Sequence, residues 1–296
     1  MDKILIKQML FYGSYLAFPF IAYAVWRMRK RGRRLVGAGL LAVSLMFVWA
    51  RFVEPQMIRV RESTLSGTGI DADIVLISDI HLGIYKDRHF LDRIVDRINA
   101  LPVDAVAIAG DLTYEPGQRS LRELFAPLAR LRHPAYAVLG NHDQQAPGPD
   151  IDKALRSALK DLGVQVIEGD IIDTPVGYRW AGLGDKWAGK DDPGFLKVGS
   201  PASPTIVIAH NPDSAMKLAP ADAVIVLAGH THGGQIRIPW LYRQVIPSAY
   251  GFDRAEQVAH GPAGDVRVFT TTGVGEIGLP MRLFNPPTLD LLHLRR

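Results

Sequence analysis

The chain has 296 residues, of which 48% are apolar and 22% are charged, so it can bury a sizeable core in one large domain or two small ones. It contains no cysteine, which excludes disulfides, thiolate metal sites and a cysteine nucleophile. The net charge is +4, but six of the 34 Lys and Arg residues lie within residues 27–34, and the other 28 are balanced by 30 Asp and Glu residues. The basic charge is therefore local, and no nucleic-acid-binding face is expected.

Two uncharged segments lie near the start of the chain. Residues 8–26 carry no charge over nineteen positions, and residues 35–50 carry none over sixteen. A membrane-spanning helix needs about 20 mostly apolar residues, and the arginines that flank the second segment can extend its reach to the lipid headgroups. Aromatic residues lie near the ends of both segments, as in membrane interfaces. The pattern predicts a membrane anchor over residues 1–53, formed by an N-terminal transmembrane helical hairpin rather than by two buried core helices.

The basic loop 27–34 orients this hairpin. Short basic loops stay in the cytoplasm, so the pattern predicts a bacterial-type inner (cytoplasmic) membrane with the rest of the chain on its extracytoplasmic side. Two alternatives stay open. Arg33 and Arg34 with the second segment resemble a twin-arginine export signal, although no A-x-A cleavage site is obvious. In the other alternative the segments lie on the membrane without crossing it, and the domain stays at the cytoplasmic face.

Residues 54–296 alternate short apolar runs with amphipathic stretches, which is typical of an α/β domain. The apolar, β-branched runs predict strands at 73–78, 104–110, 135–140, 205–210, 223–229 and 266–272, an edge strand at 57–64 and a closing strand at 288–294. Apolar residues at helical spacing predict helices at 88–101 and 151–163. Residues 185–204 have no regular pattern and are predicted to form a long surface loop.

Polar residues follow five of these strands directly. They are Asp79 and His81, then Asp111, then Asn141, His142 and Asp143, then His210, and finally His230 and His232. The carboxyl ends of strands form the ligand crevice of an α/β sheet, so these side chains are expected to converge. Carboxylate, amide and imidazole ligands without thiolate suit Mn, Fe or Zn in a catalytic site. Seven candidate ligands are too many for one open site and fit two divalent metal ions with a bridging carboxylate, which can clamp the attacking and leaving oxygens of a phosphoryl displacement.

At these residues the chain resembles the calcineurin-like metallophosphoesterase family. The family pattern D-x-H, GD, GNH[DE], H and GH-x-H stands here as SDIHLG, AGDL, LGNHD, AHNPD and AGHTHGG. The resemblance implies that residues 54–296 form a metallophosphoesterase domain, an α/β fold built as a four-layer α-β-β-α sandwich, with a dinuclear site at the strand ends. By position, the ligands of one metal would be Asp79, His81 and His232, those of the other would be Asn141, His210 and His230, and Asp111 would bridge the two.

His142 is not a ligand in this scheme. It would donate a proton or a hydrogen bond to the leaving oxygen as the catalytic residue, and Asp143 either orients it or caps the following turn. The hairpin, the GGQ that follows His232 and the tail 273–292 resemble a membrane-anchored or exported branch of the family, whose relatives include UDP-2,3-diacylglucosamine hydrolase-like proteins. Thr288 stands where that branch commonly has an acidic residue, a departure that bears on the branch more than on the chemistry.

These features predict a hydrolase that acts on a phosphomonoester, phosphodiester or pyrophosphate of an amphiphilic or cell-envelope substrate. Residues 236–252 and the side chains of Trp187, Phe195 and Leu196 either line a groove for a lipid-linked substrate or pack around an edge strand. One alternative is a UDP-2,3-diacylglucosamine pyrophosphate hydrolase of lipid A biosynthesis, although its cytoplasmic substrate conflicts with the predicted topology. A second alternative is a non-catalytic, metal-stabilised membrane scaffold, against which the non-ligand His142 argues.

Overall fold

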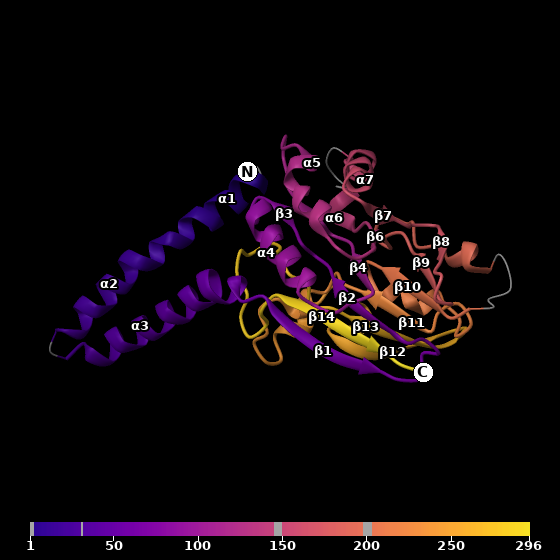
Figure 1. Cartoon of the computed structure of the whole chain (residues 1–296). Coiled ribbons are helices and arrows are strands. Elements are labelled where there is room, and N and C mark those ends of the chain that lie inside the picture. Colours follow the sequence, from indigo (N-terminus) through magenta and orange to yellow (C-terminus); the bar gives the residue numbers. More distant parts are fainter. Residues whose placement is uncertain (1–2, 31, 145–149, 198–202) are drawn as a thin grey trace.

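The computed structural model shows a body of two packed sheets, from which a pair of long helices projects to one side (Figure 1). It describes residues 3–30, 32–144, 150–197 and 203–296. Residues 198–202 of the predicted loop lie outside the described residues.

The first sheet has six strands, in the order β1 (Arg59–Leu65), β14 (Thr288–Leu294), β2 (Ala72–Ile77), β4 (Ala105–Ala109), β6 (Ala135–Val138) and β7 (Val164–Val166). Strands β2, β4, β6 and β7 are parallel, β14 is antiparallel to β2, and β1 runs parallel to β14 along the edge. Every residue of β4 and β6 is buried, as expected for parallel strands covered on both faces.

The second sheet also has six strands, in the order β12 (Ala255–Gly261), β13 (Gly264–Thr270), β11 (Ile225–Ala228), β10 (Thr205–Ala209), β9 (Arg179–Gly182) and β8 (Ile171–Asp173). The four inner strands are parallel, and the two edge strands β12 and β8 are antiparallel to their neighbours. A short parallel pair, β3 (Leu82–Gly83) and β5 (Thr113–Tyr114), lies beyond the ends of β2 and β4.

The side chains of β2 show how the layers form. Successive residues of a strand point to opposite faces. Ile74 and Leu76 accordingly belong to the core between the two sheets, which also contains Trp180 of β9. Val75 and Ile77 belong to the core on the outer face of the first sheet. A strand with both faces buried reads as a continuous apolar run, which is the pattern of residues 73–78.

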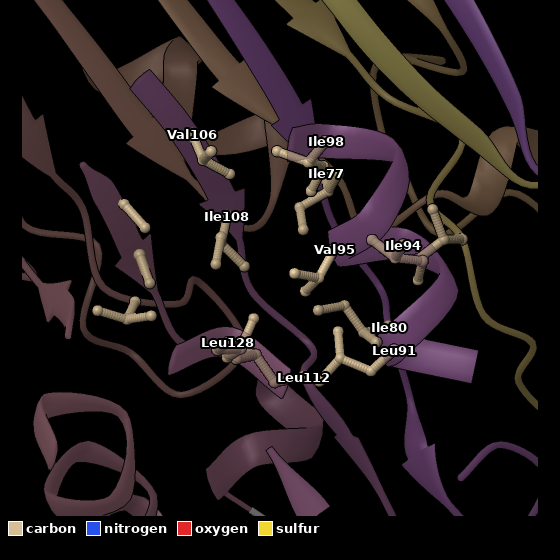
Figure 2. Close-up of a cluster of buried hydrophobic side chains, with 14 of the residues drawn as sticks. Ile77, Ile80, Leu91, Ile94, Val95, Ile98, Val106, Ile108, Leu112 and Leu128 are labelled. Carbon is tan, nitrogen blue, oxygen red and sulfur yellow. The ribbon is translucent and has the colours of Figure 1, made fainter. Parts of the chain in front are cut away.

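Helices cover the outer face of the first sheet. They are α4 (Arg88–Asn99), α5 (Leu121–Leu124), η4 (Ala126–Arg130) and α7 (Asp152–Asp161). Asp87 caps α4 by accepting a hydrogen bond from the Phe90 backbone N–H. Figure 2 shows Val95 and Ile98 of α4 facing Ile77 and Ile108 of the sheet.

The outer face of the second sheet carries 3₁₀ turns, η5 (Pro193–Lys197) and η6 (Pro212–Lys217), where the predicted sandwich would place α-helices. The two-sheet α/β sandwich itself is confirmed. All eight predicted strands and both predicted helices are present, with ends shifted by a few residues. Strands β3, β5, β7, β8, β9 and β12 were not predicted, because each is short or rich in polar residues.

Within the described residues, two helices are long and apolar enough to cross a membrane, Lys3–Met28 and Arg34–Gln56. The first consists of α1 (Lys3–Gly13), η1 (Ser14–Leu16) and α2 (Ala17–Met28), and the second of α3 (Arg34–Val48), η2 (Trp49–Val53) and η3 (Glu54–Gln56). Their apolar side chains point outward from the pair, with Leu35 exposed by 90% and Leu16 by 70%. Both helices are longer than the uncharged segments that predicted them, because Lys3, Lys7 and Arg51 lie on the same helices at the end near the body.

The hairpin is fixed to the body by polar contacts at its base. The buried Glu54 carboxylate accepts hydrogen bonds from the Trp49 indole and from the backbone N–H of Asn285. The Arg282 backbone N–H donates to the Ala50 carbonyl at 2.9 Å. The Lys7 ammonium group pairs with Glu115 at 2.5 Å. These contacts join the membrane-type helices to loops of the sandwich.

Candidate metal centre

The predicted site residues come from the carboxyl ends of strands in both sheets. Strands β2, β4 and β6 belong to the first sheet, whereas β10 and β11 belong to the second. The loops after these strands meet at one end of the sandwich, where side chains of the first sheet face side chains of the second. The site is therefore built between two packed sheets and not along the edge of one.

Asp79, His81 and His232 form the first cluster that could hold a metal ion. The Nε2 atoms of His81 and His232 lie 3.0 Å apart, and His232 Nε2 lies 3.3 Å from Asp79 Oδ1. The Nδ1 atom of His81 lies 3.2 Å from the Thr113 carbonyl oxygen. Because a carbonyl can only accept, that contact places the proton of a neutral His81 on Nδ1 and leaves the Nε2 lone pair facing the cluster.

Asp111, His210 and His230 form the second cluster. His210 Nδ1 donates to the Ala109 carbonyl at 2.8 Å, which turns its Nε2 atom inward by the same logic as in His81. That Nε2 atom lies 3.3 Å from Asp111 Oδ2 and 3.1 Å from His230 Nδ1. Both clusters are buried.

The Asp111 carboxylate belongs to the second cluster and also faces the first. Its Oδ2 atom is 3.5 Å from His81 Nε2 in the first cluster and 3.3 Å from His210 Nε2 in the second. Its Oδ1 atom accepts a hydrogen bond from the His142 backbone N–H at 2.9 Å. One carboxylate thus faces both groups of ligand-type atoms.

Two buried oxygen atoms at the site lack a hydrogen-bond partner among the described residues, and a cation would satisfy them. They are Oδ1 of Asp79 and Oδ1 of Asn141. A buried polar atom without a partner costs free energy, and such atoms call for an explanation such as an ion. The ligand types, two carboxylates, one amide oxygen and four imidazoles, suit divalent cations such as Mn, Fe or Zn. The residues present therefore fit a pair of cations.

Burial and a neighbouring carboxylate set the protonation of the histidines. Burial lowers the pKa of His81 to about 3 and that of His230 to about 3, so both imidazoles stay neutral, which is the form that binds metal. Burial also acts to lower the pKa of His210, but the neighbouring Asp111 carboxylate outweighs it and raises that pKa to about 10. A proton and a cation therefore compete for the same His210 nitrogen.

The backbone at this site is strained. Five of the seven predicted ligands have a positive φ, a region that residues other than glycine seldom occupy. They are Asp79 (53°), His81 (51°), Asp111 (52°), His230 (68°) and His232 (49°). The glycines beside them permit the close approach of the loops, because a Cβ atom on Gly140 would collide with Asp111 and one on Gly229 with Ser78. Strain of this kind concentrates at functional sites.

His142 lies beside the clusters with its ring half-buried. The ring centroid is 5.3 Å from that of His81 and 5.2 Å from that of Tyr114. The alternative that Asp143 orients His142 receives no support. The buried Asp143 carboxylate instead accepts hydrogen bonds from the backbone N–H groups of Gly140, Leu112 and Thr113, which ties together the loops that follow β4 and β6.

Sequence reasoning missed one residue that supports the site. The Asn285 side-chain amide donates to the His232 carbonyl at 2.6 Å and so fixes the turn that carries this ligand. Asn285 opens the NPP stretch of the tail, and that stretch was the available signal. Thr288, three residues later, donates its hydroxyl to the Pro286 carbonyl within the same turn.

An apolar cavity of about 610 Å³ adjoins the clusters. It is lined by Asp111, Asn141, His142, His230 and His232, together with Trp187, Ile236, Ile238, Leu241, Tyr242, Val245 and Leu279, among others. Of the residues predicted to line a groove, Trp187 and six positions of the segment 236–252, all within 236–247, line this cavity. The prediction is wrong for Phe195 and Leu196, which pack into the core on the outer face of the second sheet.

Comparison with known proteins shows which family shares these motifs. The family model described as calcineurin-like phosphoesterase matches residues 72–234. The uncharacterized metallophosphoesterase YkuE of Bacillus subtilis is 30% identical over 90% of this chain and 99% of its own length. The phosphodiesterase YaeI of Escherichia coli is 29% identical, covering 87% of this chain and 96% of its own. The UDP-2,3-diacylglucosamine pyrophosphatase LpxG of Chlamydia trachomatis is 27% identical, covering 68% and 77%. With the two clusters, these matches imply a dinuclear divalent metal centre.

Proposed function

We propose, from the premise that the chain belongs to the calcineurin-like phosphoesterase family and hydrolyses phosphoester bonds, that its substrate is an amphiphilic phosphoester reached from a membrane. The observation that carries the chemistry is the position of Asp111 Oδ2 between the two clusters, 3.5 Å from His81 Nε2 and 3.3 Å from His210 Nε2. The observation that carries the substrate class is the apolar lining of the adjoining cavity.

Each cation would have its own ligands. Asp79, His81 and His232 would hold one ion, Asn141, His210 and His230 would hold the other, and Asp111 would bridge them. The two clusters support this division, and so does the Asn141 Oδ1 atom, which has no hydrogen-bond partner among the described residues. When bound, the pair would supply an activated water and neutralise charge on the phosphoryl oxygens.

His142 would act as the proton donor. Its ring lines the cavity and packs against His81, so a leaving oxygen in the cavity is within reach of this imidazole. Its backbone N–H is held by Asp111, which keeps the side chain next to the proposed bridge. In this role His142 donates a proton or hydrogen bond to the oxygen that departs from phosphorus.

The test uses the full-length chain in detergent, reconstituted in turn with Mn, Zn or Fe. We expect uptake of two equivalents and metal-dependent release of p-nitrophenol from mono- and diesters, with a diacylated phosphodiester turned over at lower concentration than the soluble diester. Uptake of one equivalent or none would reject the dinuclear assignment. Equal use of both diesters would reject the amphiphilic substrate.

A second candidate substrate is UDP-2,3-diacylglucosamine, which the similarity to LpxG and the apolar cavity favour. Hydrolysis of its pyrophosphate bond would release UMP. The same protein preparation, incubated with this compound, would distinguish the candidates by whether UMP forms.

The proposed location is the inner membrane, with the catalytic domain on the extracytoplasmic side. The two apolar helices and the basic stretch 27–34 support this orientation. The chain lacks cysteine, so one introduced after Arg296 reports the side of the C-terminus. Labelling of intact spheroplasts by an impermeant thiol reagent is expected, and labelling only after lysis would place the domain at the cytoplasmic face.

A further inference from the structure

A group of exposed apolar side chains lies on two segments, 238–245 and 279–284, that also carry lining residues of the cavity. We name it the rim surface and define it by Ile238, Trp240, Leu241, Val245, Leu279 and Phe284. Trp240 is exposed by 86%, Val245 by 66% and Phe284 by 63%. Large apolar patches are uncommon on soluble proteins and mark interaction sites.

The backbone of this surface is held in an unfavourable conformation. Trp240 has a φ of 65° and Phe284 a φ of 57°, both in the left-handed region. An aromatic residue pays a steric cost there. The fold therefore keeps two large aromatic side chains outside the core at two strained positions, which indicates that these exposed side chains are functional.

The rim surface adjoins the base of the hairpin. Leu279 of this surface lines a small hollow together with Met9, Leu10 and Phe47 of the two apolar helices. The two segments of the rim surface are joined by a hydrogen bond from the Arg237 backbone N–H to the Leu283 carbonyl. The preceding residue, Arg282, donates its backbone N–H to the Ala50 carbonyl of the hairpin. In Figure 1 the loops in orange and yellow project from the body beside the base of the hairpin, on the side toward which the hairpin extends.

We propose that the rim surface is seated in the lipid–water interface of the same membrane that holds the hairpin. A hairpin that spans the bilayer brings the loops at its base to the depth of the headgroups, where Trp and Tyr residues are enriched. The segment 236–250 contains no acidic residue, and its exposed Arg243 suits an anionic lipid surface, whereas Arg237 is paired with Asp253. The occupant of the surface is lipid and not a second protein, because the patch is continuous with helices that are themselves built for lipid.

This placement assigns an entry route to the cavity. Ile238, Leu241 and Leu279 belong both to the rim surface and to the cavity lining. An acyl chain would then pass from the bilayer into the cavity along apolar side chains without crossing water. The route rests on the proposed function, whereas the membrane contact does not.

The contact is tested on the full-length chain in vesicles of phosphatidylcholine and phosphatidylglycerol. Single cysteines replace Trp240 or Phe284, neither of which lines the cavity, and carry the environment-sensitive dye NBD. The control is Val176→Cys. Val176 is exposed by 70% and lies near Asp71 and Asp104, at the amino ends of β2 and β4, opposite to the metal centre. We expect blue-shifted emission at both test positions and a severalfold loss of that emission with headgroup-spin-labelled lipid, but neither change at position 176.

Two results would overturn the proposal. Emission at positions 240 and 284 equal to that at position 176 would show that the surface stays in water. Emission that is shielded from water but unaffected by spin-labelled lipid would show that another protein covers it. Neither readout needs turnover, so the contact stands or falls separately from the proposed function. As a second measurement, Trp240→Asp is expected to slow hydrolysis of a vesicle-embedded diester severalfold and to leave a soluble diester unaffected, with Val176→Asp as the matched control.

Discussion

The metal centre and the N-terminal hairpin depart in opposite ways from the usual distribution of side chains, in which polar groups face water and apolar groups are buried. At the metal centre, carboxylates and imidazoles are withdrawn from water, with Asp79 and His210 at 0% exposure. In the hairpin, large apolar side chains face outward, with Leu35 at 90% exposure. Each arrangement is costly in water alone, because buried charges need partners and exposed apolar surface needs cover. Each region is therefore expected to need a partner outside the chain, cations at the metal centre and lipid at the hairpin.

Among the variants at the metal centre, Asp111→Asn should cause the largest loss of turnover. An amide cannot bridge two cations as a carboxylate does, so both metal content and turnover should fall. We expect a loss of turnover of at least about 100-fold, since even indirect supports of metal ligands are worth about 10–100-fold. Elemental analysis and p-nitrophenyl diester hydrolysis measure the two losses. Asp161→Asn, an exposed aspartate on α7, is the control, and unchanged metal and turnover in Asp111→Asn would contradict the bridging role.

His142→Ala should separate proton donation from metal binding. Turnover should fall by about 100-fold, the lower end for loss of a general acid, while the metal content stays at two equivalents. The loss should be smaller for substrates whose leaving group needs no proton, such as p-nitrophenol. His89→Ala serves as the control, because the His89 side chain is 87% exposed. Equal losses of metal and turnover would show that His142 is a ligand instead.

Asn285→Ala should weaken the support of a single ligand. Its side chain holds the His232 carbonyl at 2.6 Å, so its removal should reduce metal affinity by about 10-fold without abolishing turnover at saturating metal. Metal titration of turnover measures the shift, and Gln165→Ala, an exposed position on β7, is the control. A variant with lower turnover at every metal concentration would assign Asn285 a different role.

A pair of leucine variants compares the two environments directly. Leu91→Ala, on the buried face of α4, should lower the free energy of unfolding by about 2–5 kcal/mol. Leu45→Ala, 52% exposed on α3, should cost less than about 1 kcal/mol in detergent, because apolar detergent replaces the missing contacts as lipid would. Denaturant titration of both variants measures the difference. Similar costs would mean that Leu45 packs against protein, and that the hairpin is not surrounded by lipid.

Much of the fold followed from local pattern. The apolar run at 73–78 predicted a strand, and the structure adds that Ile74 and Val75 of this strand belong to different cores. Strand β9 was not predicted, because it has only four residues and Arg179 and Gly182 occupy its two ends. Its pairing with β8 and β10 is what makes it a strand. Asn285 was not predicted either, because its role is a contact with a residue 53 positions earlier.

Local sequence patterns indicated which side chains could bind metal, because each predicted ligand follows an apolar run that was expected to form a buried strand. They also indicated that two helices are too apolar for water. The grouping of the strands could be seen only in the three-dimensional fold, where β2, β4 and β6 form one sheet and β10 and β11 form another, so that Asp111 meets His210 across the sandwich. The physical reason is that strand pairing and sheet packing join residues about 100 positions apart, as in the contact between Ala109 and His210, and no local property of either segment specifies its partner.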